Sequence, residues 1–322
     1  MSPPSLPEYD ASDPVESAIV RRLASNWARR ATVKKAEPEL DDLFDSSLSD
    51  YPRSTSPVRG ASDLPGIETR AEATPASLGM DRVQQERHGH REVRRQSRFD
   101  VLAEDRLGVG LGDWAAVAVN QAMVDEQYHT LMHFNASSAT RRGRGLGGLP
   151  AKALPDVLTV RTRAQALDAA EGPRKIALTQ LAFMTVAEVS ITAYLDLISD
   201  DPGVQSINRA TIRLHARDEY CHASIAGGIG RPGLGFPGWW RSQLSIEGFE
   251  DAMRAFSGTD FGAWRAIMEI EAIPGGRKML DDVALEPHNE LFVQDYSGIT
   301  SLLQKLQVTS EVTIAADKYS AS

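Results

Sequence analysis

Apolar residues recur at helical spacing along most of the chain. Near the N-terminus, Val15, Ile19, Leu23 and Trp27 fall on every fourth position and predict the apolar stripe of a helix. Asp13-Pro14 is the expected start, because an acidic N-cap followed by proline favours a first helical turn. Other periodic segments predict long helices over residues 113–133, 173–199 and 206–226, and short ones around residues 249–256, 263–273 and 299–306. Alternating strand patterns are scarce, so we predict an all-α fold.

The segments between these helices are polar or rich in glycine and proline. Residues 135–148 predict a basic, Gly-rich loop, residues 227–240 a Gly/Pro-rich loop, and residues 40–52 a short packed connection. We therefore expect four parts in addition to an anomalous segment: a disordered start, an N-terminal helix with its connection, a helical bundle and a tail. These parts cover residues 1–12, 13–52, 99–312 and 313–322.

Residues 53–98 differ in kind from the rest of the chain. They contain nine arginines but no lysine, phenylalanine, tyrosine or tryptophan, and their apolar residues keep no period. Taken alone, such a composition predicts a disordered basic linker, with a nucleic-acid-binding arm as the alternative.

The composition of the 322-residue chain indicates a globular protein. Its 42% of hydrophobic residues is ample for a core, and its net charge of −9 argues against general nucleic-acid binding. Cys221 is the only cysteine and no signal-like segment opens the chain, so we expect a cytoplasmic protein. The apolar run over residues 176–198 is long enough for a membrane span, but Glu188 at its centre favours a buried core helix.

A short motif, D-E-x-x-H, occurs twice in the predicted helices. It covers residues 125–129 in one helix and residues 218–222 in another. Residues three apart share one face of a helix, so each motif presents a carboxylate and an imidazole in the same direction. Paired Glu-x-x-His helices, with further glutamates from other helices, are typical of di-iron and di-manganese carboxylate bundles. The pattern therefore predicts a ferritin-like bundle around a two-metal site.

More potential ligands accompany the two motifs. His215, Glu219 and His222 stand at positions i, i+4 and i+7 and share one stripe of their helix. Glu188 lies in an apolar helix, where an unpaired carboxylate is costly and requires a cation or a proton. With Glu126, three glutamates would repel one another around a common core unless divalent metals neutralise them. Carboxylate and imidazole donors suit iron, or manganese as the alternative, better than structural zinc.

Residues beside these donors admit more than one interpretation. Asp125 and Asp218 point about 100° away from the potential ligands. They are placed to orient a histidine of the neighbouring helix, with a solvated surface charge as the alternative. Packing or support of a ligand is expected for His133, with a direct ligand as the alternative, and core packing for Cys221. Core packing is also expected for Tyr128, with a pocket residue as the alternative, and a solvated loop for residues 141–144, with an anion site as the alternative.

These residues resemble the p-aminobenzoate N-oxygenase family, bacterial di-iron oxygenases that convert arylamines to nitro compounds in natural-product pathways. The likeness covers V-D-E-Q-Y-H-T-L-M-H from Val124, V-A-E ending at Glu188, and L-H-A-R-D-E-Y-C-H-A-S-I from Leu214. Residues 31–33, 50–52 and 295–298 are similar as well. The resemblance implies two iron ions held by Glu126, His129, Glu188, His215, Glu219 and His222.

The resemblance also implies the reaction and its partners. The implied partners are an arylamine small molecule, O₂ and an external electron donor, and neither a nucleic acid nor a membrane. No catalytic side chain beyond the metal centre is implied. A homodimer is compatible with the resemblance. An arginine that family members with carboxylated substrates carry after residues 295–298 is replaced here by Ile299-Thr300-Ser301, so a substrate carboxylate is not implied. Two alternatives stay open: a ferroxidase-like di-metal protein and a metal-free helical binding module.

Residues 53–98 are where the likeness fails. Members of the family have a further glutamate ligand on a helix before the first motif, and this sequence has no such helix. Read one nucleotide later, permitted codons of Met80–Gln85 encode W-I-A-Y-N-K, which resembles the start of that helix. In the same frame, the codons of Arg91 and Glu92 straddle a glutamate codon. We hypothesise that residues 53–98 are translated out of frame, which the gene's nucleotide sequence decides. If residues 53–98 are translated as given in this sequence, that glutamate ligand is missing and the resemblance no longer implies activity.

Overall fold

The computed structural model describes residues 16–35, 39–50, 52, 99–108, 113–146, 155–229, 243–270, 272–285, 300, 303 and 304. Within these ranges the secondary structure is helical, apart from one isolated bridge between Ser49 and Val204. The predicted all-α class is confirmed. The expectations for residues 1–12, 53–98 and 313–322 fall outside the described ranges.

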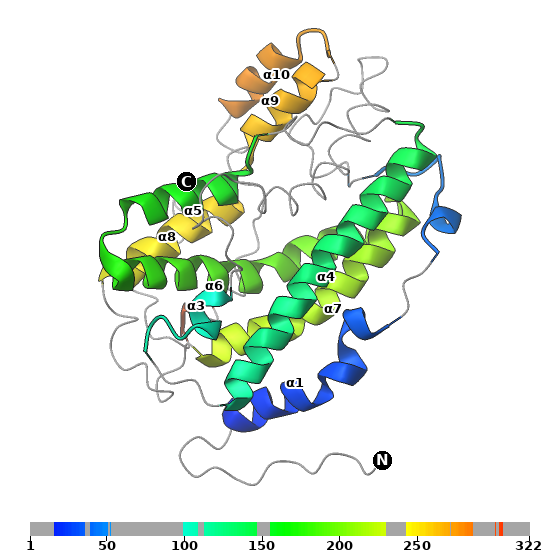
Figure 1. Ribbon diagram of the computed structural model, residues 1–322. Helices are drawn as coiled ribbons and strands as arrows, with labels where there is room; N and C mark the ends of the chain where they lie inside the picture. The colour runs from blue at the N-terminus through cyan, green and yellow to red at the C-terminus, as the bar shows by residue number, and fades with distance from the viewer. Residues whose placement is uncertain are drawn as a thin grey trace.

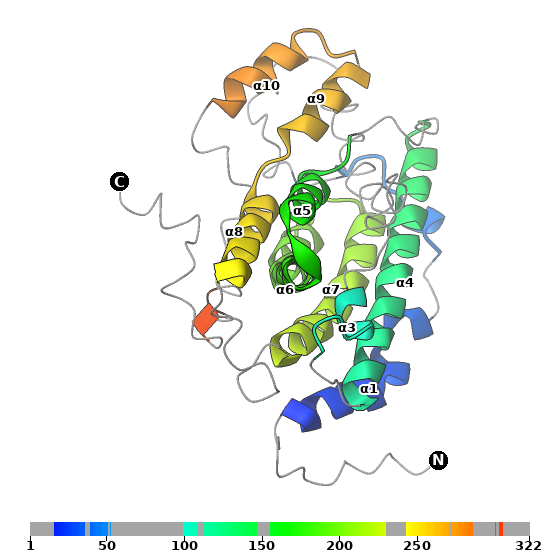
Figure 2. The same cartoon turned by 60° about the vertical axis from the view of Figure 1, so that its left-hand side comes forward.

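Three long helices form the centre of the molecule: α4 (Asp113–Gly143), α6 (Gly172–Ser199) and α7 (Ser206–Ile229). α7 packs against both α4 and α6 (Figure 1). On one side, α1 (Glu16–Arg30) lies against α4 and α7, and the 3-10 turn η1 (Thr32–Lys34) continues it. On the other side, α8 (Gln243–Ser257) and α5 (Leu158–Ala169) pack on α6 (Figure 2). The remaining helices are the short α3 (Asp100–Ala103), which contacts α4 and α6, and the pair α9 (Phe261–Ile270) and α10 (Gly276–Ala284).

α6 is the core helix of the bundle, and it confirms the helix predicted over residues 173–199. Pro173 lies in its first turn, where the missing proline N–H costs no helical hydrogen bond. Every residue from 177 to 188 is buried. By length and composition alone, Gly172–Asp196 could cross a membrane, but 71% of its most apolar window is buried inside the protein. A core helix has this character.

α4 is longer than the sequence pattern predicts. The loop expected from residue 135 is wrong for residues 135–143, which continue the helix. Ala136 and Ala139 are buried in a cluster with Ile207 and Ile212 of α7, and the Thr140 hydroxyl donates to Asn208 Oδ1 at 3.3 Å. Small side chains let the two helices approach closely, so this contact keeps a sequence helical that resembles a loop in isolation.

Residues 39–50 dock on the C-terminal end of α4, as the predicted packed connection requires. The Arg144 guanidinium donates to Asp50 Oδ1 at 3.0 Å and to the Ser46 carbonyl at 2.9 Å. Asp50 is buried, and burial raises the pKa of its carboxyl against the opposing effect of Arg144. Arg142 pairs with Asp41 across 2.6 Å. Residues 141–144 therefore anchor this connection, and the predicted free solvated loop is wrong.

The other predicted elements agree with the structure to different degrees. Short helices expected around residues 249–256 and 263–273 correspond to α8 and α9, while α5 and α10 were not predicted. The helix predicted over residues 206–226 extends to Ile229, so the loop expected at residues 227–240 is wrong at its start, and its remainder lies outside the described residues. Most of the helix predicted at residues 299–306 also lies outside them, although residues 300, 303 and 304 are helical.

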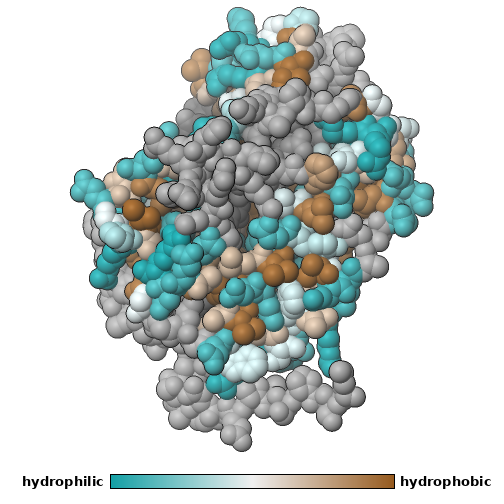
Figure 3. Space-filling view, viewed as in Figure 1, coloured by the Kyte–Doolittle hydropathy of each residue, from teal (hydrophilic) through white to brown (hydrophobic). Residues whose placement is uncertain are grey.

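The outer face of α4 carries exposed hydrophobic residues, with uncharged polar residues between them from residue 114 to residue 134. Of the eight large hydrophobic residues exposed in the described part of the chain, five lie on this helix: Trp114, Val117, Val124, Leu131 and Phe134. Spacings of three and seven residues put them on one side of the helix, and Gln121 and Tyr128 between them carry no charge. In Figure 3, hydrophobic residues follow the diagonal that α4 occupies in Figure 1. We call these five residues the α4 stripe.

The end of α4 depends on a glycine. A Cβ added at Gly143 would lie 2.6 Å from the Phe44 ring, well inside contact distance. We therefore expect Gly143→Ala to destabilise the protein by about 1–3 kcal/mol through overpacking, although alanine favours helix more than glycine. Urea unfolding measures the effect. In a Phe44→Ala background the same substitution should be neutral or stabilising, and an equal loss in both backgrounds would contradict the contact.

Candidate metal centre

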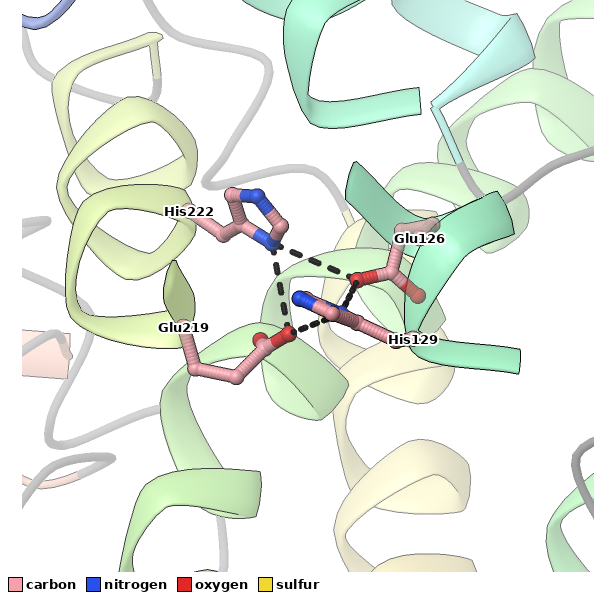
Figure 4. Close-up of side chains that lie close together, drawn as sticks. All are labelled: Glu126, His129, Glu219 and His222. Carbon is pink, nitrogen blue, oxygen red and sulfur yellow. Dashed lines mark hydrogen bonds and ion pairs between the residues drawn. The ribbon is translucent and has the colours of Figure 1, made fainter. Parts of the chain in front are cut away.

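The two D-E-x-x-H motifs meet where α4 and α7 pack together. Glu126 and His129 come from α4, and Glu219 and His222 from α7 (Figure 4). One oxygen or nitrogen of each lies within 4.8 Å of the others. Each glutamate Oε1 is 3.3 Å from the Nδ1 atoms of both histidines. Residues three apart on each helix thus form a compact group of two carboxylates and two imidazoles.

The other two predicted ligands lie beside this group. Glu188, from the centre of α6, places Oε2 3.5 Å from His222 Nδ1. His215, one turn before Glu219, places Nε2 3.0 Å from Glu219 Oε1. Three helices therefore bring all six side chains to one buried place. Glu188 and Glu219 side chains are 1–2% exposed, whereas Glu126 is 21% exposed, so the site is most open beside Glu126.

The protonation states of these glutamates and histidines depend on one another. Burial, followed by the charges of Glu219 and Glu126, raises the pKa of Glu188 to about 8. Burial and Glu219 also act to raise the pKa of Glu126, but hydrogen bonds with His129 and His222 outweigh them and hold it at about 2. Burial opposes protonation of both histidines, yet the surrounding carboxylates raise the pKa of each well above its usual value. Without a metal ion, protons on His129 and His222 supply positive charge, and a proton on Glu188 neutralises its carboxylate.

Two aspartates hold the far side of the histidine rings. Asp218 Oδ2 of α7 is 3.2 Å from His129 Nε2 of α4, and Asp125 Oδ2 of α4 is 3.3 Å from His222 Nε2 of α7. Both aspartates are buried, so the surface-charge alternative is wrong and the predicted orienting role has the required geometry. With Nε2–H donated to the aspartate, Nδ1 of each ring faces the glutamates, where it can donate a hydrogen bond when protonated or bind a metal ion when deprotonated.

A further histidine stands behind His215. His133 Nε2 is 2.7 Å from His215 Nδ1, and both rings are buried. Burial, and then the neighbouring histidines, lower the pKa of each, so a neutral pair with one shared hydrogen bond fits the site. His133 therefore supports His215, as expected. Cys221 and Tyr128 are partly buried and belong to no metal-ligating group among the described residues.

The donor set fits a pair of hard or borderline divalent metal ions. Three carboxylates and three imidazoles converge with no thiolate among them, which favours iron or manganese over structural zinc. Sequence reasoning missed three residues that contact the aspartates from outside: Trp27, Arg30 and Thr32. Trp27 stands in an apolar stripe and Thr32 contributes a backbone N–H, so neither gave a signal of this role.

Comparison with known proteins identifies the chain's relatives. The family model described as P-aminobenzoate N-oxygenase AurF matches residues 100–307, which include every helix that carries the six side chains. A 4-aminobenzoate N-oxygenase from Streptomyces thioluteus is 25% identical over 301 residues, covering 92% of this chain and 89% of that protein. The helical structure agrees with this relationship and with the predicted ferritin-like bundle. The chain therefore belongs to the p-aminobenzoate N-oxygenase AurF family.

Proposed function

We propose that this oxygenase-family protein is a di-iron N-oxygenase that oxidises the amino group of an arylamine with O₂. The convergence of three carboxylates and three imidazoles in one buried site carries the proposal. The relative from Streptomyces thioluteus is a 4-aminobenzoate N-oxygenase, which supports an arylamine as the substrate class. A substrate carboxylate is not part of the proposal, because the arginine expected after residues 295–298 is replaced in this sequence.

Six residues would hold two iron ions, with manganese as the alternative metal: Glu126, His129, Glu188, His215, Glu219 and His222. Iron bound there would supply the activation of O₂. Asp125 and Asp218 would fix the ring orientation of His222 and His129, so that Nδ1 faces the metals. The buried run of α6 around Glu188 excludes water from one side, and the partly exposed Glu126 marks the side where O₂ and amine would enter.

The overall reaction requires an electron donor. Conversion of an amine to a hydroxylamine inserts one oxygen atom of O₂ into an N–H bond and reduces the other atom to water with two electrons and two protons. The chain has a single cysteine, Cys221, so it has no thiol pair to supply these electrons, and we propose an external reductant. Further oxidation of the hydroxylamine would give the nitro compound.

The start of the family match bears on the missing ligand. The family model matches from residue 100, directly after the Arg-rich segment of residues 53–98. This supports our hypothesis that the segment is out of frame and that the correct frame encodes the helix with the further glutamate.

Oxygen consumption tests the proposed reaction. Protein loaded with iron under anaerobic conditions, then given a chemical reductant and O₂, should consume O₂ in proportion to added aniline or 4-aminobenzoate and release an oxygenated amine. Glu219→Ala should lower this amine-dependent rate by at least about a hundredfold. The substitution removes a proposed iron ligand whose Oε1 lies 3.3 Å from Nδ1 of both His129 and His222.

Other outcomes assign the alternatives. O₂ consumption that follows added Fe(II) and ignores the amine would indicate a ferroxidase and contradict N-oxygenation. Absence of bound iron in the wild-type protein would indicate the metal-free binding module.

We further propose that the α4 stripe pairs with the same stripe of a second copy about a twofold axis. The face contains aromatic and aliphatic residues but no charge, which is the character of an interface core. Because the face is uncharged, two copies can meet there without like-charge repulsion, although the chain carries a net charge of −9. An antiparallel arrangement is isologous and brings the Trp114 end of one helix to the Phe134 end of the other.

Leu131→Lys should convert this dimer to a monomer, because it buries one unpaired charge from each copy within the interface. Light scattering after size exclusion measures the mass. Leu285→Lys, an equally large change at an 82% exposed position of another helix end, should leave the dimer intact. A monomeric wild-type protein at micromolar concentration, or a dimeric Leu131→Lys variant, would contradict the proposed interface.

A further inference from the structure

The N-terminal helix contacts the metal site from behind. The Trp27 indole N–H donates to Asp125 Oδ1 at 2.9 Å, across 98 positions in the sequence. Five residues later, the backbone N–H of Thr32 donates to Asp218 Oδ2 at 3.1 Å. These are the two aspartates that hold His222 and His129, so the segment of residues 27–32 reaches both halves of the site.

The two relays differ in how firmly they fix the aspartate. In Asp125 the two carboxylate oxygens have separate partners. Oδ1 accepts from Trp27, whereas Oδ2 lies 3.3 Å from His222 Nε2 and 3.9 Å from Arg30 Nη1. A carboxylate held at both oxygens cannot rotate without losing a hydrogen bond. In Asp218 the same oxygen, Oδ2, meets both Thr32 and His129. Trp27 is therefore the side chain whose single N–H most directly controls the orientation of a histidine.

Independent contacts hold the segment in place. The Thr32 hydroxyl donates to the Leu214 carbonyl of α7 at 3.1 Å and accepts from Arg217 at 2.8 Å. Ala31 is fully buried, and Gln121 of α4 donates to the Ala24 carbonyl at 3.2 Å. Since these contacts do not involve the indole N–H, removal of that N–H alone should leave α1 docked.

We propose that Trp27 is a positioning residue for the metal site, acting through Asp125 on the ring orientation and tautomer of His222. This inference rests on the proposed metal-binding function. The indole N–H holds Asp125, Asp125 holds Nε2–H of His222, and His222 Nδ1 is thereby directed at Glu126, Glu188 and Glu219. Loss of the N–H would let the aspartate and the ring rotate, at the expense of metal affinity.

Trp27→Phe keeps the aromatic body and removes the donor. The matched control is Trp264→Phe, on α9, away from the site. Mn(II) affinity of the full chain is measured by competition with a coloured chelator, and the electron paramagnetic resonance spectrum of bound Mn(II) reports ligand geometry. We expect Trp27→Phe to bind Mn(II) about tenfold more weakly, with an altered spectrum, and Trp264→Phe to match the wild type. The metal-free unfolding temperature of Trp27→Phe should fall slightly, because the buried Asp125 Oδ1 loses its donor.

Asp125→Asn breaks the same relay at its next member and should weaken Mn(II) binding similarly, with no additive loss in the double variant. If Trp27→Phe does not fold, wild-type affinity of Asp125→Asn would overturn the relay. If Trp27→Phe folds and binds Mn(II) with wild-type affinity and spectrum, the inference is wrong and the proposed function stands. If the wild-type chain binds neither Mn(II) nor Fe(II), both are wrong.

Discussion

Mutual repulsion of buried carboxylates is the constraint on which the centre of this structure depends. Glu126, Glu188 and Glu219 each approach the same atom, His222 Nδ1, within 3.3–3.5 Å. An uncompensated charge in such a site costs several kcal/mol, and three would cost more than a domain of this size can spare. Positive charge must therefore accompany them, either as protons on neighbouring groups or as metal cations.

The arrangement of helices follows from this requirement. α4 and α7 each supply a carboxylate and an imidazole from residues three apart, and α6 supplies a carboxylate from an otherwise apolar surface. Each of the two helices also carries the aspartate that holds the histidine of the other helix. Because Asp125 and Asp218 cross the interface in opposite directions, the distance and rotation between α4 and α7 are coupled to the geometry of the site. α1 adds a further layer of contacts around the same aspartates.

Local sequence was sufficient to predict the features that depend on helical spacing. The paired motifs predicted two helices with inward donors, and Pro173 with Pro202-Gly203 bracketed α6 closely. The full set of six residues came from the family resemblance. Features that depend on a partner far along the chain were not predictable: residues 135–143 look like a loop until α7 packs on them. Likewise, the role of Trp27 depends on a contact across 98 positions. For Asp125 the sequence left two interpretations open, and its contact with His222 across 97 positions favours the orienting one.

The effect of metal on stability tests the central claim most directly. Divalent cations should replace the protons on His129 and His222, whose pKa values are raised, so binding requires their deprotonation and strengthens as pH rises from 6 to 8. We predict that anaerobic Fe(II), at about a hundred times its dissociation constant, stabilises the folded chain by about 2.7 kcal/mol per site. The effect should saturate at two ions per chain, with proton release seen by calorimetry in buffers of different ionisation enthalpy. Unchanged unfolding with Fe(II) and Mn(II), or equal stabilisation after Glu188, Glu219 and Glu126 are all changed to glutamine, would contradict the account.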